Sequence, residues 1–204
     1  MIGAGGHARV LRESLGLSGI ELSGYVATTS EPALPGVAWL GPDDALAGLD
    51  SGSVWLVNGV GSAGDPRARI RVWDEAKAAG FTFATVIDPR AIVHGSAELA
   101  EGAQVLTGAI IGTRVSVGAD CIINTGAIVD HDVALADHVH VSPGAVIAGG
   151  VTVGRASHVG LGARVIQGVS IGSQSIVGAG AVVLHDIADG ELAVGVPAVG
   201  RPRS

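Results

Sequence analysis

A six-residue repeat that runs without insertion through half of the chain constrains the fold more than any other feature. An aliphatic residue occupies the first position of seventeen consecutive hexads, from Ile87 to Val183. The fifth position is small or β-branched throughout, from Ala91 to Ile187. An α-helix needs apolar residues at a spacing of about 3.6 and disfavours so much glycine and β-branching. The period therefore predicts short, stacked strands.

Hexapeptide repeats of this kind are typical of a parallel β-helix, in which three hexads close one triangular coil. The narrow interior accepts Val, Ile and Ala but no rings, and all six aromatic residues lie within the first 83 of the 204 positions. The pattern resembles the left-handed parallel β-helix of hexapeptide acyltransferases. The handedness comes from that resemblance, because parallel crossovers are usually right-handed.

The residues before the repeats alternate between predicted strands and helices. We expect helices near 6–17, 43–49 and 65–79, and strands near 20–27, 54–57 and 81–87. Pro66 suits the first helical position and Gly80 suits a helix end. The alternation predicts a small, Rossmann-like parallel α/β domain over 1–86, followed by a β-helix with a C-terminal tail over 87–204. Only Met1 and Ile2 precede the glycines that begin at Gly3, so the first strand is either vestigial or begins before the given start.

The composition excludes several classes of protein. Apolar residues make up 48% of the chain and charged residues 15%, which excludes a disordered protein. The net charge of −7 with a single lysine leaves no basic stripe for nucleic acid or anionic lipid. No apolar run reaches the roughly 18 residues of a membrane span, and no secretory signal follows Met1. The single cysteine, Cys121, suits a reducing compartment, so we expect a cytoplasmic protein.

A glycine-rich segment near the start is the first candidate site. Gly3-x-Gly5-x-x-Ala8 fits a loose dinucleotide fingerprint, in which glycine lets a phosphate approach the backbone at a helix N-terminus. A domain of this size is too small for a two-halved dinucleotide fold, so the diphosphate of a nucleotide-linked substrate is the better ligand. The alternative is a tight strand-to-helix turn that binds nothing.

The second candidate site centres on His131 and Asp132. They occupy the third and fourth positions of their hexad, so we expect both at an outward corner of the coil. An 18-residue coil stacks Gly149 directly on His131, about 4.8 Å away. Bare backbone beside an imidazole leaves room for substrate and an N–H for an oxyanion, while the carboxylate orients the ring as a general base. The alternative is a solvated corner histidine, which is the expectation for His94 and His185.

The chain resembles bacterial sugar acetyltransferases. The resemblance rests on Gly3–Val10, on Asn124–Ser142, on the hexads and on Val194-Gly195-Val196-Pro197-Ala198. That family includes sialic acid O-acetyltransferases and nucleotide-linked 4-amino-sugar N-acetyltransferases. The resemblance implies that His131 is the catalytic base, tuned by Asp132, and that His140 and Gly149 contact the acetyl end of acetyl-CoA. It implies a pantetheine site at the backbone of Leu161 and Ala179, and a nucleotide-sugar site at the following residues: Gly5, Gly6, His7, Asn58 and Gly59. It also implies a homotrimer with active sites between subunits.

The chain departs from this family at one place. After the second strand the family usually carries two aspartates near the nucleotide's ribose or base, whereas this chain has Ala27-Thr28. The sequence therefore does not determine whether the nucleotide of the substrate is UDP, GDP or dTDP. Candidate partners for the CoA phosphates are Arg155, Arg164, Arg201 and Arg203, for which solvated surface charge is the alternative.

The sequence thus predicts an acetyl-CoA-dependent N-acetyltransferase that acts on the 4-amino group of a nucleotide-linked deoxysugar by direct attack. No acyl-enzyme is expected, because Cys121 points inward and no serine has a placed base. A sugar O-acetyltransferase would use the same base on a hydroxyl. A zinc lyase of the β-helical carbonic anhydrase type would use histidines among His131, His138, His140 and His158, although no metal is expected. A non-catalytic β-helix would carry a flat ladder of outward threonines, which this chain lacks.

Overall fold

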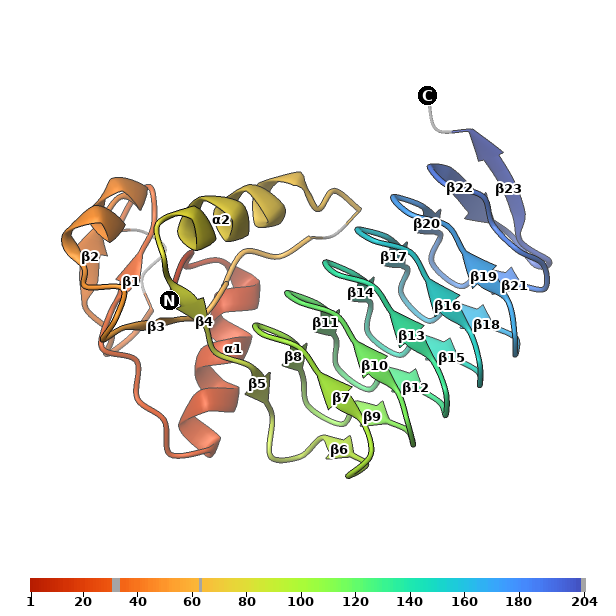
Figure 1. The fold of residues 1–204 in the computed structure, drawn as a ribbon, viewed down its shortest axis with the longest axis horizontal. Helices are drawn as coiled ribbons and strands as arrows, with labels where there is room; N and C mark the ends of the chain where they lie inside the picture. Colours follow the sequence, from red (N-terminus) through yellow and green to blue (C-terminus); the bar gives the residue numbers. More distant parts are fainter. Residues whose placement is uncertain (31–33, 63, 203–204) are drawn as a thin grey trace.

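The computed structural model describes residues 1–30, 34–62 and 64–202. A small α/β region with both α-helices lies against one end of a long stack of short strands (Figure 1). Helix α1 spans Gly6–Leu17, the 3-10 helix η1 spans Asp43–Gly48, and α2 spans Arg67–Ala78. The strands of this region are β1 (Tyr25–Val26), β2 (Trp39–Gly41), β3 (Trp55–Leu56) and β4 (Thr82–Phe83).

The hexads form a parallel β-helix with one two-residue strand for each repeat. The seventeen strands are β5 (Val86–Ile87), β6 (Ile92–Val93), β7 (Glu98–Leu99), β8 (Gln104–Val105), β9 (Ile110–Ile111), β10 (Ser116–Val117), β11 (Ile122–Ile123), β12 (Ile128–Val129), β13 (Ala134–Leu135), β14 (His140–Val141), β15 (Val146–Ile147), β16 (Thr152–Val153), β17 (His158–Val159), β18 (Arg164–Val165), β19 (Ser170–Ile171), β20 (Ile176–Val177) and β21 (Val182–Val183). Each strand from β5 to β18 pairs in parallel with the strand three further along, as in the register His140 to His158. The second residue of every strand is the first position of a hexad, which confirms the predicted repeat.

Three sheets make the three faces of the coil. The first face contains β5, β8, β11, β14, β17 and β20; the second contains β6, β9, β12, β15, β18 and β21; the third contains β7, β10, β13, β16 and β19. The tail adds β22 (Glu191–Val194) in parallel to β20, and β23 (Val199–Pro202) returns antiparallel to β22. These stacked parallel sheets fit a left-handed β-helix.

The interior of the β-helix is a column of small aliphatic side chains. Residues at the first and fifth hexad positions, such as Val141 and Ala145, are almost completely buried from Ala103 to Val183. Each buried CH₂ group contributes about 0.8 kcal/mol, so the stack gains stability coil by coil. The first coil is the exception, because its inward residues are less buried: Ile87 is 41% exposed although it holds an inward position.

The strands of the N-terminal region pair in parallel around Ile2. β1 pairs with β2, β3 pairs with β4, and Ile2 forms bridges to both Val26 and Asn58. The spatial order is therefore β2, β1, Ile2, β3, β4. The first predicted strand is thus present, but it is reduced to a single bridging residue between two pairs.

Several element boundaries differ from those predicted. The strand near 20–27 contains only β1, the segment 81–87 divides into β4 and β5, and Pro66 is the N-cap of α2 instead of its first residue. Strand β2 was not predicted, because two of its three residues, Trp39 and Leu40, are exposed and give no alternating pattern.

The two regions are joined through the first face. Helix α1 packs on β5, and Ser14 donates a 2.7 Å hydrogen bond to Asp88 at the start of the β-helix. On the other side of the joint, Arg69 of α2 is 1% exposed and lies 2.7 Å from Asp120. The α/β region therefore covers the first face and is fixed relative to it.

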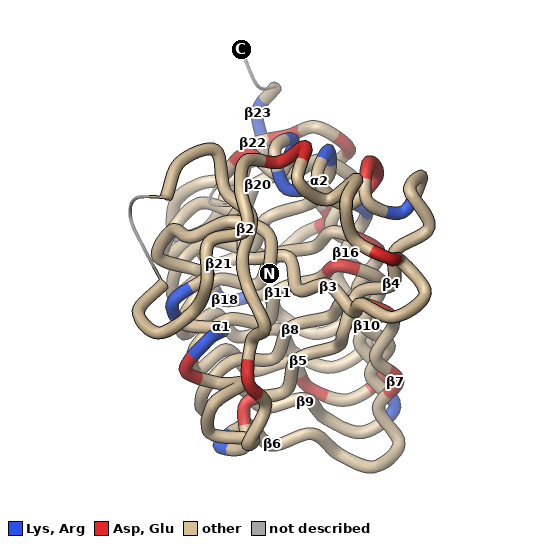
Figure 2. Tube along the Cα trace, turned by 90° about the vertical axis from the view of Figure 1, so that its left-hand side faces the viewer, with Lys and Arg blue, Asp and Glu red and all other residues tan. Residues whose placement is uncertain are grey.

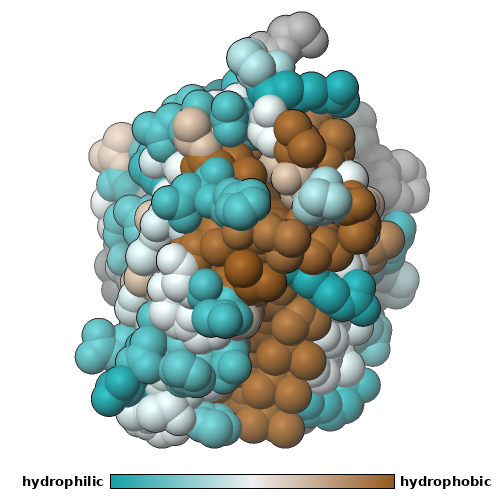
Figure 3. Space-filling view, turned by 90° about the vertical axis from the view of Figure 1, so that its right-hand side faces the viewer, coloured by the Kyte–Doolittle hydropathy of each residue, from teal (hydrophilic) through white to brown (hydrophobic). Residues whose placement is uncertain are grey.

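The other two faces are uncovered and differ in character. The outward residues of the third face are polar or small, as at Ser116 and Thr152. Those of the second face are mostly aliphatic, including Ile92 and Ile128, which are 55% and 36% exposed. Figure 3 shows apolar side chains gathered in a column along this side of the molecule.

Charge and hydropathy add two facts about the surface. In Figure 2, Lys and Arg are dispersed among Asp and Glu, as expected from the sequence. Within the described ranges, no helix is long and apolar enough to cross a membrane.

Candidate active site

His131 and Asp132 lie together on an exposed corner of the coil, as predicted. This corner, which we call the His131 corner, contains the turns that lead from the second face to the third. The side chains of His131 and Asp132 are 61% and 38% exposed, and His131 Nδ1 lies 2.8 Å from Asp132 Oδ2. An ionised carboxylate only accepts hydrogen bonds, so the Nδ1 nitrogen carries the proton. The lone pair of Nε2 is therefore available for a substrate proton.

The electrostatics of this corner make the imidazole more basic. The pKa of His131 is raised by its hydrogen bond to Asp132 and by the charge of Asp130, while Arg114 acts in the opposite direction. The pKa of Asp132 is lowered by its hydrogen bonds to His131 and Arg114. At neutral pH the pair thus consists of a fixed carboxylate and an imidazole close to its own titration range.

Gly149 lies against the imidazole, one coil above it. A Cβ atom at this position would be 2.5 Å from both Cε1 and Nε2 of His131, so only glycine fits beside the ring. Gly150 N–H donates to His131 O at 3.0 Å, which sets the stacking of the two turns. Among the described residues, none accepts a hydrogen bond from Gly149 N–H. The predicted geometry of an imidazole beside a bare N–H is present.

His140 lies elsewhere, on the first face and beneath the N-terminal region. Its ring is 7% exposed, with Nδ1 3.1 Å from Ser62 Oγ and Nε2 3.1 Å from the Asn124 side-chain amide. Burial lowers the pKa of His140 to about 3, helped by the neighbouring His158, so the ring is neutral. Since Asn124 Oδ1 already accepts from Thr125 N–H at 2.8 Å, its amide nitrogen donates to His140. His140 therefore has no free N–H for an oxyanion.

Leu161 and Ala179 stack on the corner between the first and second faces, which we call the Leu161 corner. Gly180 N–H donates to Leu161 O at 2.8 Å, and the Leu161 side chain is 58% exposed. Exposed backbone and an exposed aliphatic side chain are suited to bind an extended chain such as the pantetheine arm expected at these residues. The Leu161 corner also holds Asn124, so it adjoins His140.

A single chain does not bring these two groups together. His131, Asp132 and Gly149 lie at one edge of the second face, and Leu161 and Ala179 lie at the opposite edge. Strands β12, β15 and β18 separate them. The arginines expected near CoA are also dispersed: Arg155 lies at the corner between the third and first faces, Arg164 on the second face and Arg201 in β23, and Arg203 lies outside the described residues.

The glycine-rich segment borders a cavity of about 320 Å³ in the N-terminal region. Its lining includes Gly3, Gly5, Thr28 and Arg71, so it lies beyond the ends of Ile2 and β1 and beside α2. In open parallel sheets, ligands bind beyond the carboxyl ends of the strands where the strand order reverses. Gly5 is the N-cap of α1 and makes no side-chain contact there, which leaves the first N–H groups of the helix available.

The remaining residues expected at this site have structural contacts. His7 Nε2 lies 2.7 Å from Gln104 Oε1, and burial lowers the pKa of His7 to about 4. Asn58 is 1% exposed and its amide donates to Asp120 at 3.1 Å. A Cβ on Gly59 would lie 2.7 Å from Ile2 O, so this glycine allows two strands to approach. Gly6 is exposed in the first turn of α1.

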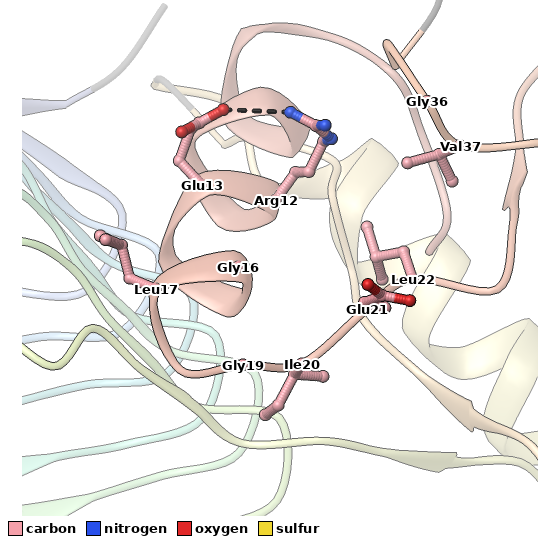
Figure 4. Close-up of a pocket in the computed structure, with 10 residues that line it drawn as sticks. All are labelled: Arg12, Glu13, Gly16, Leu17, Gly19, Ile20, Glu21, Leu22, Gly36 and Val37. Atoms are coloured by element: carbon pink, nitrogen blue, oxygen red, sulfur yellow. Dashed lines mark hydrogen bonds and ion pairs between the residues drawn. The ribbon is translucent and has the colours of Figure 1, made fainter.

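Another cavity is lined by none of these residues. It measures about 590 Å³ and is bordered by the end of α1 and by the segment 19–22 (Figure 4). Its charged side chains are Arg12, Glu13 and Glu21, and Arg12 pairs with Glu13 at 3.1 Å. Among the described residues that line it there is no histidine and none of the predicted site residues.

The donor groups do not assemble a metal site. In the part of the chain that the structure describes, no three His, Cys, Asp or Glu side chains are grouped as ligands. His140 and His158 do stack, with ring centroids 4.8 Å apart, but His131 lies at another corner. Cys121 is fully buried and its pKa is raised to about 12 by burial, so it is not a nucleophile.

A parallel β-helix that exposes a His–Asp pair beside a bare glycine defines the class of hexapeptide-repeat acyltransferases. No protein-family model and no curated protein sequence matches the chain. Solved structures do match it, over nearly its whole length.

One match is a variant of perosamine N-acetyltransferase from Caulobacter crescentus, in complex with CoA and GDP-perosamine. It is 41% identical with a TM-score of 0.92, covering 99% of this chain and 95% of that chain. The acetyltransferase domain of PglB from Neisseria gonorrhoeae, in complex with acetyl coenzyme A, is 33% identical with a TM-score of 0.92, covering 98% and 97%. WeeI from Acinetobacter baumannii, at 20% identity and a TM-score of 0.85 over 98% and 97%, shows the fold alone. The chain therefore belongs to the hexapeptide-repeat nucleotide-sugar acetyltransferases, and it is an acetyltransferase.

Sequence reasoning missed two groups of polar residues. Arg114 binds Asp132 through Nε at 2.7 Å, and Asp120 joins Arg69, Asn58 and His138 beneath α2. Both groups contain residues 18 apart, Arg114 with Asp132 and Asp120 with His138. The coil length was a signal that would have found them.

Proposed function

We propose that this enzyme transfers the acetyl group of acetyl-CoA to the 4-amino group of a nucleotide-linked deoxysugar. The observation that carries the proposal is the His131–Asp132 pair with Gly149 beside the ring, in a family whose solved members bind CoA or acetyl-CoA. The perosamine enzyme, at 41% identity, was crystallised with a GDP-linked amino sugar, which supports the same class of acceptor here.

The chemistry uses His131 as a general base. The neutral sugar amine attacks the thioester carbonyl carbon, and His131 Nε2 takes a proton from the attacking nitrogen. Gly149 N–H donates to the oxyanion of the tetrahedral intermediate, a type of interaction that is worth about 3 kcal/mol. The C–S bond then breaks, the amide remains on the sugar, and the imidazolium returns its proton to the CoA sulfur. Asp132 orients the ring and stabilises its positive charge throughout.

The acceptor would bind through the α/β region, which we infer to be a Rossmann-like domain over 1–86 that precedes a β-helix domain over 87–204. The strand order around Ile2 and the cavity beside Gly3 and Gly5 support this inference. The diphosphate would lie at the N-terminus of α1, where the helix dipole and free N–H groups favour anions. The charged residues that line the same cavity are Arg71 and Asp43, and Arg71 is the one that could pair with a diphosphate.

We further infer a homotrimer in which each active site lies between two copies. The His131 corner and the Leu161 corner occupy opposite edges of the apolar second face. Packing second faces around a threefold axis would bury exposed residues such as Ile92 and Ile128 and bring the His131 corner of one copy to the Leu161 corner of the next. The single buried thiol, Cys121, fits the cytoplasmic location that we infer for this assembly.

The activity is tested by thiol release from acetyl-CoA with a panel of GDP-, UDP- and dTDP-linked 4-amino sugars, together with hydroxyl acceptors. We expect acetylation of a 4-amino sugar and its loss in His131→Ala. Acetylation of a hydroxyl alone would identify a sugar O-acetyltransferase instead. Full activity of the His131→Ala enzyme would refute the mechanism.

The shared site is tested by mixing two inactive variants. His131→Ala damages one corner and Leu161→Glu the other, so neither homotrimer has an intact site. After co-refolding, mixed trimers contain interfaces with both corners intact, and we expect part of the wild-type activity to return. No recovery, in trimers shown to be mixed by mass spectrometry, would contradict a site between copies.

A further inference from the structure

Arg114 lies one coil below Asp132 and binds it directly. Its Nε donates to Asp132 Oδ1 at 2.7 Å, and its Nη2 contacts the same oxygen. The other oxygen, Oδ2, lies 2.8 Å from His131 Nδ1. The two oxygens of one carboxylate are thus divided between a guanidinium and the proposed catalytic imidazole.

The backbone of this corner holds both charged residues in an unfavourable conformation. Arg114 has φ +55° and Asp132 has φ +58°, whereas the next two residues in the column, Gly150 and Gly168, have φ +69° and +70°. A residue other than glycine in this region costs about 1 kcal/mol or more. The N–H of Arg114 is held by Ser96 Oγ at 3.1 Å. Two strained positions are therefore occupied by side chains that contact each other.

The contact restricts how Asp132 meets the imidazole. Without a partner on Oδ1, a carboxylate that is 38% exposed is free to rotate and to exchange its hydrogen bonds with those of water. With Arg114 in place, Oδ2 stays on Nδ1, which keeps the proton on Nδ1 and leaves Nε2 beside Gly149 unprotonated. Guanidinium suits this task because two of its nitrogens, Nε and Nη2, hold the single oxygen Oδ1 and leave Oδ2 for the imidazole.

Arg114 also opposes the negative charges that face His131. Asp130 and Asp132 raise the pKa of the imidazole and Arg114 lowers it; Thr113 and Gly149, the neighbours of His131 in its column, carry no charge. A catalytic base works best when its pKa lies near the operating pH. Arg114 therefore partly offsets the two carboxylates, which raise the pKa of the base.

We propose that Arg114 is a positioning residue for catalysis, which fixes Asp132 and thereby the orientation and proton-accepting form of His131. This inference rests on the proposed function of His131. Among the described residues, the contacts of the Arg114 guanidinium are to Asp132 and not to His131, so Arg114 positions the imidazole through one carboxylate, while its charge also acts on the pKa of the imidazole.

The test compares Arg114→Gln and Arg114→Lys with the wild type in the pH profile of kcat/KM. We expect Arg114→Gln to lower kcat about tenfold with little change in KM. Its acidic limb should move to higher pH, because His131 must lose its proton to act and no cation lowers its pKa. Arg114→Lys retains the charge but not the fork, so its limb should stay in place while kcat falls partially.

Arg67→Gln is the matched control. Arg67 forms an equally short and more exposed ion pair with Asp65, at 2.7 Å, at the start of α2. We expect wild-type kinetics from it. If Arg114→Gln has wild-type kcat and an unchanged profile while His131→Ala is inactive, Arg114 is only a surface ion pair and the inference is wrong. If His131→Ala is fully active, the proposed role of His131 is wrong. The two outcomes are distinguishable because they are measured in different variants.

Discussion

Two corners of the same β-helix carry a histidine–aspartate pair, and they differ in what covers them. The His131 corner faces solvent, with Nδ1 of His131 2.8 Å from Asp132. The remaining corner, between the third and first faces, holds His138, whose Nδ1 lies 3.1 Å from Asp120 Oδ2. The side chains of His138 and Asp120 are 4% and 0% exposed. We call this corner the His138 corner, and helix α2 covers its histidine–aspartate pair.

The covered pair joins the two regions of the molecule. Asp120 Oδ1 accepts from the Asn58 amide at 3.1 Å and lies 2.7 Å from Arg69 Nη2, an ion pair without good hydrogen-bond alignment. Arg69 in turn donates to the carbonyl oxygens of Asn58 and Val60. The rings of Trp73 and His138 pack in a T-shaped arrangement. The same chemical pair is thus buried in the joint between the two regions at one corner and open to solvent at the other.

The largest expected effect separates activity from stability at the exposed corner. His131→Gln should lower kcat about 10³-fold, within the range of lost general-base catalysis, and leave the melting temperature unchanged. Steady-state kinetics and calorimetry measure the two quantities. His185→Gln, which alters another exposed histidine, should leave both unchanged. A melting temperature that fell with kcat would show that the exposed pair is structural as well.

The opposite outcome is expected at the covered corner. Arg69→Leu leaves the Asp120 carboxylate buried without its cation, which should lower the free energy of unfolding by about 3–5 kcal/mol. Denaturant unfolding at a fixed protein concentration measures this loss. Adding Asp120→Asn to Arg69→Leu removes the unpaired charge and should restore part of the stability. A single variant as stable as the wild type would show that the buried pair does not hold the regions together.

A smaller effect is expected from a methyl group placed against the base. Gly149→Ala puts a Cβ 2.5 Å from the His131 ring, so the ring must shift and kcat should fall about 10²-fold. Gly95→Ala is the control, because a Cβ there meets nothing within 4 Å. Crystal structures of both variants would show whether the ring has moved. Unchanged kcat with a displaced ring would contradict the role of its position.

The smallest effect is a difference in acid stability. Burial lowers the pKa of His7 to about 4, whereas an unfolded histidine has a pKa of about 6.5. The unfolded state therefore binds more protons between these values, and the free energy of unfolding falls as the pH decreases through that window. In His7→Gln this fall should be about 2 kcal/mol smaller between about pH 7 and about pH 4.5, as measured by urea unfolding at both values. Equal falls in both proteins would show that His7 is protonated in the folded state.

Much of the fold was predictable because the repeat is local. Every coil buries the same two positions, so the pattern from Ile87 to Val183 predicts each strand and places His131 and Asp132 outward. The coil length also predicts that Gly149 stacks on His131, and the contact confirms it. The α/β region was predicted less accurately, since β2 is short and exposed and the first strand is reduced to Ile2.

The sequence by itself determined which residues point inward, which form turns and which stack on one another, because in a β-helix these follow from spacing alone. Only the tertiary structure decided what covers each corner. The docking of α2 on the His138 corner buried His138, and the loop 58–62 enclosed His140 beneath Ser62. The His131 corner stayed open. Contacts between segments far apart in the chain depend on how two regions dock, and no periodicity encodes that.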